Sequence, residues 1–151
     1  MKAHGRELLS GYYKKAYDPK VVPTSLEEPF KIKITPALIL GGKIDRIDTL
    51  EDGTLEIIDY KTGTAPTSRD PAKDKQLTVY ALSVPNKKVI VSFYFFEDQK
   101  KVSATRTKEE LEKAKKDIAT KAAEIERSDF APTPGKWCDF CEFRLICEAW
   151  N

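Results

Sequence analysis

The chain has 151 residues, of which 33% are charged and 40% are hydrophobic, a composition of ordinary globular domains rather than of disordered, collagen-like or membrane proteins. Its 26 basic and 24 acidic residues give a net charge of only +2, so overall charge does not indicate a polyanionic partner. No apolar run reaches the roughly 18 to 20 residues of a membrane helix, and the N-terminus lacks the apolar segment of a signal peptide. We therefore expect a single monomeric domain in the cytoplasm with no membrane partner.

The first part of the chain predicts a helix followed by three strands. Apolar residues recur at spacings of three and four over Arg6–Tyr17, which is typical of an amphipathic helix. Over Phe30–Ile34 apolar residues alternate with lysines, the pattern of a half-buried strand, and a second strand follows over Leu38–Asp48. The segment Glu51–Thr54 contains an Asp-Gly turn signal, so Leu55–Lys61 is predicted to return as the second arm of a hairpin.

The rest of the body predicts a helix, two strands and a long helix. Helical spacing resumes over Gln76–Leu82, and Val89–Phe96 is β-branched and aromatic enough for a buried strand. A weaker strand is expected near Lys101–Thr105. Thr107 precedes Glu110 by three residues, a capping box that opens a charged helix to about Arg127. This order of elements predicts a mixed α/β domain.

All three cysteines lie near the C-terminus, after a Pro-rich separator at 132–135. We expect a core over residues 1–131 and a short tail over residues 132–151 that packs on it, within one domain overall. An odd number of crowded cysteines suits a metal centre better than a disulfide framework. These cysteines are Cys138, Cys141 and Cys147.

The predicted hairpin contains a candidate site. Asp59 and Lys61 share a face, because alternate residues of a strand point the same way, and Asp45 lies almost symmetrically across the turn. A two-residue loop at Asp52-Gly53 would pair Asp45 with Tyr60 and send the two aspartates to opposite faces. If both bind one metal, the register must shift by one, through an odd-length loop containing a left-handed Gly53 or through a bulge near Asp45. We predict such an irregularity.

Two carboxylates and a backbone carbonyl are hard oxygen ligands of the kind that Mg²⁺ or Mn²⁺ accepts while it keeps several waters. Such a metal lowers the pKa of a bound water and polarises a phosphate, while Lys61 orients that water or stabilises negative charge. The other interpretation is that Asp45 and Asp59 are exposed hairpin ends and Lys61 pairs with one of them. Aspartate is depleted in strand interiors, however, and Asp59 directly follows two strong β formers, which favours a functional site.

Three segments resemble motifs of one family, in the same order. Gly42–Asp48 looks like G-x-x-D-R-x-D, Asp59–Gly63 looks like D-Y-K-T-G, and Gln76–Tyr80 looks like Q-x-x-x-Y, all three from the RecB-type branch of the PD-(D/E)xK nuclease superfamily. The resemblance implies a restriction-endonuclease-like core with a central mixed sheet of about four to five strands flanked by helices. It further implies an Mg²⁺- or Mn²⁺-dependent deoxyribonuclease, of exonuclease type, that acts on DNA beside the helicase domains of a recombination or repair enzyme.

The resemblance also implies roles for individual residues. Asp45, Asp59 and the backbone carbonyl of Tyr60 would bind the metal, and Lys61 would be the catalytic lysine. The two motif residues of the helix, at positions i and i+4 on one face, would line the DNA or metal-water side of the site. The implied catalytic residues are thus Asp45, Asp59, Lys61, Gln76 and Tyr80. Behind them the resemblance implies supporting positions at Glu27, Arg46 and Asp48.

The cysteines Cys138, Cys141 and Cys147 resemble a C-terminal triad that in many members holds a [4Fe-4S] cluster together with an upstream cysteine. That fourth cysteine is absent from this sequence. Members of the family also have a histidine on an early helix that joins the metal site, but His4, the sole histidine here, lacks the residues that surround it in that motif. We expect a truncated chain or a degenerate copy. One alternative function is therefore a nuclease-like domain that binds DNA or braces a helicase without cutting. Another is a zinc module of the three cysteines and His4, and a third interpretation leaves three reduced thiols without metal.

Overall fold

The computed structural model describes residues 2–66, 71–84 and 87–150. A five-stranded sheet runs in the order β1-β2-β3-β4-β5. All neighbouring strands are antiparallel except β3 and β4, which are parallel. The strands are β1 (Ser25–Lys33), β2 (Ile39–Thr49), β3 (Leu55–Lys61), β4 (Val89–Phe95) and β5 (Lys100–Ala104). The helices are α1 (Lys2–Lys15), α2 (Lys75–Ser83) and α3 (Lys108–Glu126). The predicted mixed α/β sheet flanked by helices is confirmed.

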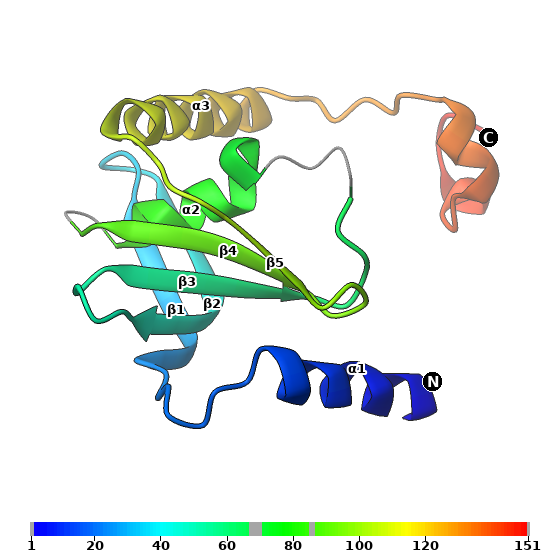
Figure 1. Cartoon of the computed structure of the whole chain (residues 1–151). Coiled ribbons are helices and arrows are strands. Elements are labelled where there is room, and N and C mark those ends of the chain that lie inside the picture. The colour runs from blue at the N-terminus through cyan, green and yellow to red at the C-terminus, as the bar shows by residue number, and fades with distance from the viewer. Residues whose placement is uncertain (1, 67–70, 85–86, 151) are drawn as a thin grey trace. The chain divides into compact units, whose positions relative to one another are not determined.

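Helices α1 and α2 contact opposite faces of the sheet (Figure 1). The parallel pair β3 and β4 is joined through α2, so the two strands end at the same edge, where Lys61 pairs with Phe95. On the α2 face, the fully buried Ile57, Leu77 and Phe93 form the centre of the core. Burial of each such side chain contributes about 1.5 to 3 kcal/mol. The core therefore fixes α2 against the middle of β3 and β4.

The hairpin of β2 and β3 has the shifted register that the sequence predicts. Thr49 pairs with Leu55 and Arg46 with Ile58, so the loop between the strands has an odd number of residues and Asp45 falls opposite Asp59. Within that loop Gly53 has φ +79°, the left-handed conformation that glycine adopts without a Cβ clash. Both aspartates therefore lie on the same face of the sheet.

A second irregularity lies at the same level of β2. Ile44 and Ile47 both belong to the core cluster, although residues three apart in a regular strand point to opposite faces. Across from this point in β1, Glu27 lies between the paired positions 26 and 28 and has φ +53°. The regular alternation of β2 is thus interrupted around Asp45.

The helix boundaries follow the sequence signals closely. The capping box of α3 is present, because Thr107 N–H donates to Glu110 Oε2 at 2.8 Å and Glu110 N–H donates to Thr107 Oγ1 at 3.2 Å. Helix α1 begins at Lys2, earlier than the expected Arg6. Of the helices described, none combines the length and apolar character needed to cross a membrane.

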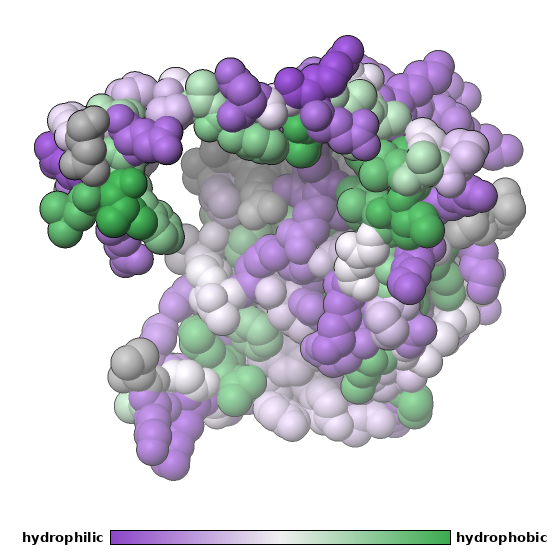
Figure 2. Space-filling model, turned by 180° about the vertical axis from the view of Figure 1, so that it is seen from behind, coloured by the Kyte–Doolittle hydropathy of each residue, from purple (hydrophilic) through white to green (hydrophobic). Residues whose placement is uncertain are grey.

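The chain divides into two compact units, Met1–Ala119 and Thr120–Asn151. The second unit contains the end of α3 and two short 3₁₀ turns, Lys136–Phe140 and Arg144–Ile146, in the cysteine-bearing segment. Its apolar side chains are open to solvent, with Phe140 84% and Leu145 88% exposed (Figure 2). No residue of these two turns is buried.

Candidate active site

Asp59 is a buried carboxylate at the centre of the candidate site. It lies in β3, is 3% exposed, and is held from the α2 side. Its Oδ1 accepts hydrogen bonds from Gln76 Nε2 at 2.9 Å and from Tyr80 Oη at 3.0 Å. A buried charge without such donors would be strongly destabilising. Helix α2 therefore supplies the groups that keep a carboxylate inside the core.

Lys61 completes this cluster from two positions further along β3. Its Nζ lies 2.6 Å from Asp59 Oδ2 and donates to Gln76 Oε1 at 3.0 Å. The ammonium also lies 5.3 Å from the centre of the Phe93 ring. Since Gln76 bonds to Asp59, to Lys61 and to Tyr80 Oη at 2.9 Å, this amide fixes the relative positions of all three.

Asp45 reaches the same region from β2. Its Oδ2 accepts a hydrogen bond of 2.9 Å from the backbone N–H of Tyr60. The ladder between β2 and β3 ends at the pair Arg46 and Ile58, one position before the two aspartates. The carboxylate of Asp45 thus takes the place of a strand partner for Tyr60, and β2 and β3 separate at this point.

The hydroxyl of Tyr80 is held in its neutral form. Burial, followed by the negative charge of Asp59, raises the pKa of Tyr80 to about 12. The hydroxyl therefore remains a hydrogen-bond donor to Asp59 at any ordinary pH.

The donors present fit a hard divalent cation. Asp59 Oδ2 is fully buried and, among the described residues, accepts no hydrogen bond, although it faces the Lys61 ammonium. Asp45 lies on the same face of the sheet and brings further carboxylate oxygens to this region. No group of three or more His, Cys, Asp and Glu side chains gathers in the described ranges. Such a set suits Mg²⁺ or Mn²⁺ that retains waters rather than a cage of protein ligands.

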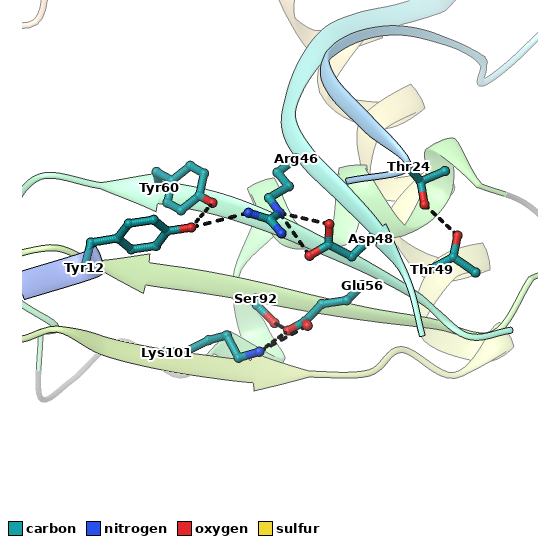
Figure 3. Close-up of polar contacts among 9 residues, drawn as sticks. All are labelled: Tyr12, Thr24, Arg46, Asp48, Thr49, Glu56, Tyr60, Ser92 and Lys101. Carbon is teal, nitrogen blue, oxygen red and sulfur yellow. Dashed lines mark hydrogen bonds and ion pairs between the residues drawn. The ribbon is translucent and has the colours of Figure 1, made fainter. Parts of the chain in front are cut away.

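The structure places Arg46 and Asp48 away from this cluster, on the α1 face of the sheet (Figure 3). Arg46 Nε donates to both carboxylate oxygens of Asp48 at 2.9 Å, and its Nη1 donates to Tyr12 Oη at 3.3 Å. Glu27 is exposed and pairs with Lys43 at 2.5 Å. None of these three contacts the Asp59 cluster in the bonds described.

The sequence did not predict a second group of polar side chains on the α1 face, formed by Glu56, Ser92 and Lys101. Glu56 is 7% exposed and Ser92 is 0% exposed. Ser92 Oγ donates to Glu56 Oε1 at 2.7 Å, and Lys101 Nζ lies 2.8 Å from the same oxygen (Figure 3). The sequence holds one signal for it, because Glu56 lies within the predicted strand at a position that alternation assigns to the face opposite Asp59.

A cavity of about 530 Å³ lies on this α1 face, and Tyr12, Arg46, Asp48 and Glu56 are among its lining residues. It does not include Asp45, Asp59 or Lys61. Its two most buried carboxylates, Asp48 and Glu56, are paired with Arg46 and Lys101, as Asp59 is paired with Lys61. We place the candidate chemistry on the α2 face because the motif residues Asp45, Asp59 and Lys61 lie there together.

The cysteine tail carries the three cysteines considered as ligands of an iron–sulfur cluster or a zinc ion. Cys138 and Cys147 are half-buried and Cys141 is exposed. The three thiols do not form a ligand group in the described part of the chain. His4, the other ligand of the zinc hypothesis, has its Nε2 2.6 Å from Glu97 Oε1.

Comparison with known proteins supports one family. The sequence profile of the PD-(D/E)XK nuclease superfamily matches residues 2–148. A subunit of an ATP-dependent helicase/deoxyribonuclease from Streptococcus mutans is 47% identical over 45 residues, which are 30% of this chain and 4% of that protein. The crystal structure of SSO0001 superposes with a TM-score of 0.56 at 16% identity, covering 99% of this chain and 70% of that one. That profile covers almost the whole chain, and the chain therefore belongs to the PD-(D/E)XK nuclease superfamily.

Proposed function

We propose that this chain is a metal-dependent deoxyribonuclease domain that hydrolyses phosphodiester bonds. The observation that carries the proposal is the state of Asp59, a buried carboxylate with one oxygen bonded to Gln76 and Tyr80 and the other facing the Lys61 ammonium at 2.6 Å. The shifted register places Asp45 on the same face of the sheet. Two carboxylates that can hold a metal ion and a lysine beside them are groups that metal-assisted phosphate hydrolysis uses.

Asp45, Asp59 and the Tyr60 carbonyl are the groups that would hold Mg²⁺ or Mn²⁺, which when bound supplies a water of lowered pKa and a positive charge beside the phosphate. Lys61 lies 2.6 Å from Asp59 and 3.0 Å from Gln76, and a small rotation turns its remaining donors toward a phosphate oxygen. In hydrolysis the water oxygen bonds to phosphorus and loses a proton, while the bond to the leaving oxygen breaks and that oxygen takes up a proton. Lys61 then stabilises the negative charge that builds up on the phosphate oxygens.

The proposed substrate is DNA, and the proposed setting is a RecB-type helicase-nuclease of recombination or repair. Local similarity to the helicase/deoxyribonuclease subunit of Streptococcus mutans supports this assignment. The chain matches only 4% of that protein's length, so exonuclease action and helicase domains as partners are proposals of their own.

Cleavage of labelled single- and double-stranded DNA in Mn²⁺ or Mg²⁺ tests the proposal. We expect Asp59→Asn and Lys61→Met each to lower the rate by at least about 100-fold, because each removes a charge that acts on the phosphate or its metal. The matched controls are Asp52→Asn and Lys88→Met, which break an exposed pair of 3.3 Å in the hairpin loop and are expected to cut like the parent.

Two outcomes would contradict the proposal. Cleavage that survives both Asp59→Asn and Lys61→Met would assign the activity to other residues or to a contaminant. A parent chain that binds DNA in a fluorescence-anisotropy assay, but neither cuts it nor binds Mn²⁺, would favour the non-cutting DNA-binding domain instead.

A further inference from the structure

Tyr60 connects the two faces of the sheet. Its backbone N–H donates to Asp45 Oδ2 at 2.9 Å on the site side. Its side chain points the other way, and its hydroxyl shares a hydrogen bond of 3.1 Å with the hydroxyl of Tyr12 in α1 (Figure 3). Because Tyr60 lies between Asp59 and Lys61 in β3, the position of its peptide affects both neighbours.

Arg46 makes the corresponding connection from β2. It follows Asp45 directly, and its Nη1 donates to the same Tyr12 hydroxyl at 3.3 Å. Its Nε is held by both oxygens of Asp48, which is 5% exposed. One hydroxyl of α1 is therefore bonded to the residue after Asp45 and to the residue after Asp59.

This connection lies just beyond the end of the β2–β3 ladder. The ladder ends at Arg46 and Ile58, so it does not pair Asp45 with Asp59 directly, although β3 stays paired with β4 through Lys61. Beyond the ladder, the hydrogen bond from Tyr60 N–H to Asp45 Oδ2 links the two strands. Contacts made by the residues that follow each aspartate add to the restraint on the separation of the two carboxylates.

Helix α1 is well placed to provide that restraint. The Tyr12 ring packs against Tyr94 at 5.2 Å and against Phe96 at 5.6 Å between ring centres. Gln99 Nε2 donates to the carbonyl of Leu8 in α1 at 3.0 Å. Tyr12 is thus fixed to β4 and its following turn, and its hydroxyl has a defined position.

We propose that Tyr12 is a positioning residue for the metal site, and that its hydroxyl, through Arg46 and Tyr60, sets the separation of Asp45 and Asp59. The inference rests on the proposed metal-dependent function. It assigns to Arg46 and Asp48 a role that acts from the opposite face of the sheet. It also gives α1 a function beyond covering the sheet, because the hydroxyl of Tyr12 adds little to the apolar packing of its ring.

The test compares Tyr12→Phe with Tyr13→Phe in the full chain. Both changes remove one hydroxyl from α1, but Tyr13 is 61% exposed and contacts its neighbours Tyr12 and Tyr17 through its ring. Mn²⁺ affinity is measured by electron paramagnetic resonance of the free ion, and stability by urea unfolding. We expect Tyr12→Phe to weaken Mn²⁺ binding by about tenfold or more, as loss of a supporting hydrogen bond behind a metal ligand does, while Tyr13→Phe binds like the parent.

A second variant tests whether weaker Mn²⁺ binding comes from the loss of this hydrogen bond or from a general loss of stability. Tyr60→Phe removes the other hydroxyl of the same bond, so we expect it to weaken Mn²⁺ binding to a similar degree. The double variant is expected to lose little more than either single one, because both act through one interaction. The kcat for DNA cleavage should fall with the metal affinity, while the KM for DNA stays near that of the parent.

The results distinguish the two proposals from each other. If Tyr12→Phe binds Mn²⁺ like the parent while Asp59→Asn loses Mn²⁺ affinity, the positioning role of Tyr12 is overturned. The proposed metal-dependent function stands in that case. If the Mn²⁺ affinity of Tyr12→Phe falls only in proportion to its urea midpoint, and the losses of affinity in the double variant add up, Tyr12 is a structural residue. Both results would overturn its positioning role. If Asp59→Asn also binds Mn²⁺ like the parent, the proposed function fails together with the inference.

Discussion

At the scale of single residues, the site depends on how a carboxylate is accommodated inside a core. Asp59 is almost completely buried, its hydrogen-bond donors come from α2, and the Lys61 ammonium lies 2.6 Å from its other oxygen. Gln76 is central, because its amide both donates to Asp59 and accepts from Lys61. A hydrocarbon side chain of similar size at Gln76 would leave both charges with fewer partners.

We therefore predict that Gln76→Leu lowers the free energy of unfolding by about 1 to 3 kcal/mol, the effect of leaving a buried polar group unsatisfied. Cleavage should fall by about 100-fold, because Lys61 and Asp59 lose their common partner. Urea unfolding and DNA cleavage measure the two effects. The control is Thr78→Val in the same helix, which loses bonds to the Asp74 carbonyl and Arg106. If it loses as much cleavage as Gln76→Leu, general destabilisation explains the result.

The raised pKa of Tyr80 predicts that the folded chain loses stability at alkaline pH. Its pKa is raised from 10.0 to about 12, so the folded chain holds this proton more tightly than the unfolded chain. The stabilisation is fully present below pH 10 and is lost as pH rises from there to about 12, because the unfolded state then releases the proton first.

Urea midpoints across this pH range check the prediction. Tyr80→Phe should show a shallower fall than the parent, since phenylalanine does not titrate. The exposed Tyr13→Phe serves as the control variant. An equal fall in the parent and in Tyr80→Phe would contradict the assignment.

At the scale of elements, the hairpin loop determines whether the site exists. A side chain moves to the other face with every one-residue slip of register, so the odd-length loop with Gly53 at φ +79° is what puts Asp45 and Asp59 on one face. The loop is also held by Leu50 N–H donating to the Thr54 carbonyl at 2.8 Å and by Gly53 N–H donating to the Leu50 carbonyl at 2.9 Å.

We predict that Gly53→Ala destabilises the chain by about 1 kcal/mol or somewhat more, because alanine is strained at positive φ. The matched change Gly5→Ala should stabilise it by about 0.5 to 1 kcal/mol, since Gly5 lies within α1 with nothing near its missing Cβ. Urea unfolding of both variants shows whether each change raises or lowers the free energy of unfolding. Equal shifts in the same direction would show that the loop conformation does not require glycine.

At the scale of the whole molecule, the parallel connection through α2 brings the chemistry of two distant segments together. Gln76 and Tyr80 meet Asp59 because α2 packs across β3 and β4 on its way between them. All the residues named for the candidate site, Asp45, Asp59, Lys61, Gln76 and Tyr80, belong to the first unit.

We predict that replacing Cys138, Cys141 and Cys147 together by serine leaves the free energy of unfolding of the core within about 0.5 kcal/mol of the parent, because none of the three is fully buried. Urea unfolding measures it, and the same variant should cut DNA at the parent's rate. An absorbance band near 400 nm in parent protein prepared without oxygen, absent from the variant, would show an iron–sulfur cluster and contradict a metal-free tail.

The sequence alone determined the elements and their order, and it singled out Asp45, Asp59 and Lys61. Those signals are local, since alternation, turn residues and caps act over a few positions. It also predicted the register shift, on the condition that Asp45 and Asp59 bind one metal. The site assignment itself remains a prediction for the cleavage and binding experiments.

Only the tertiary structure decided which face each supporting residue occupies and what it touches. Arg46 and Asp48 are adjacent to the site in sequence but lie on the α1 face, and Tyr12 reaches Arg46 from 34 residues away. Contacts of this kind depend on how α1 and α2 pack on opposite faces of the sheet. Packing joins residues that no local pattern relates, which is why the network behind the site appears only in the folded chain.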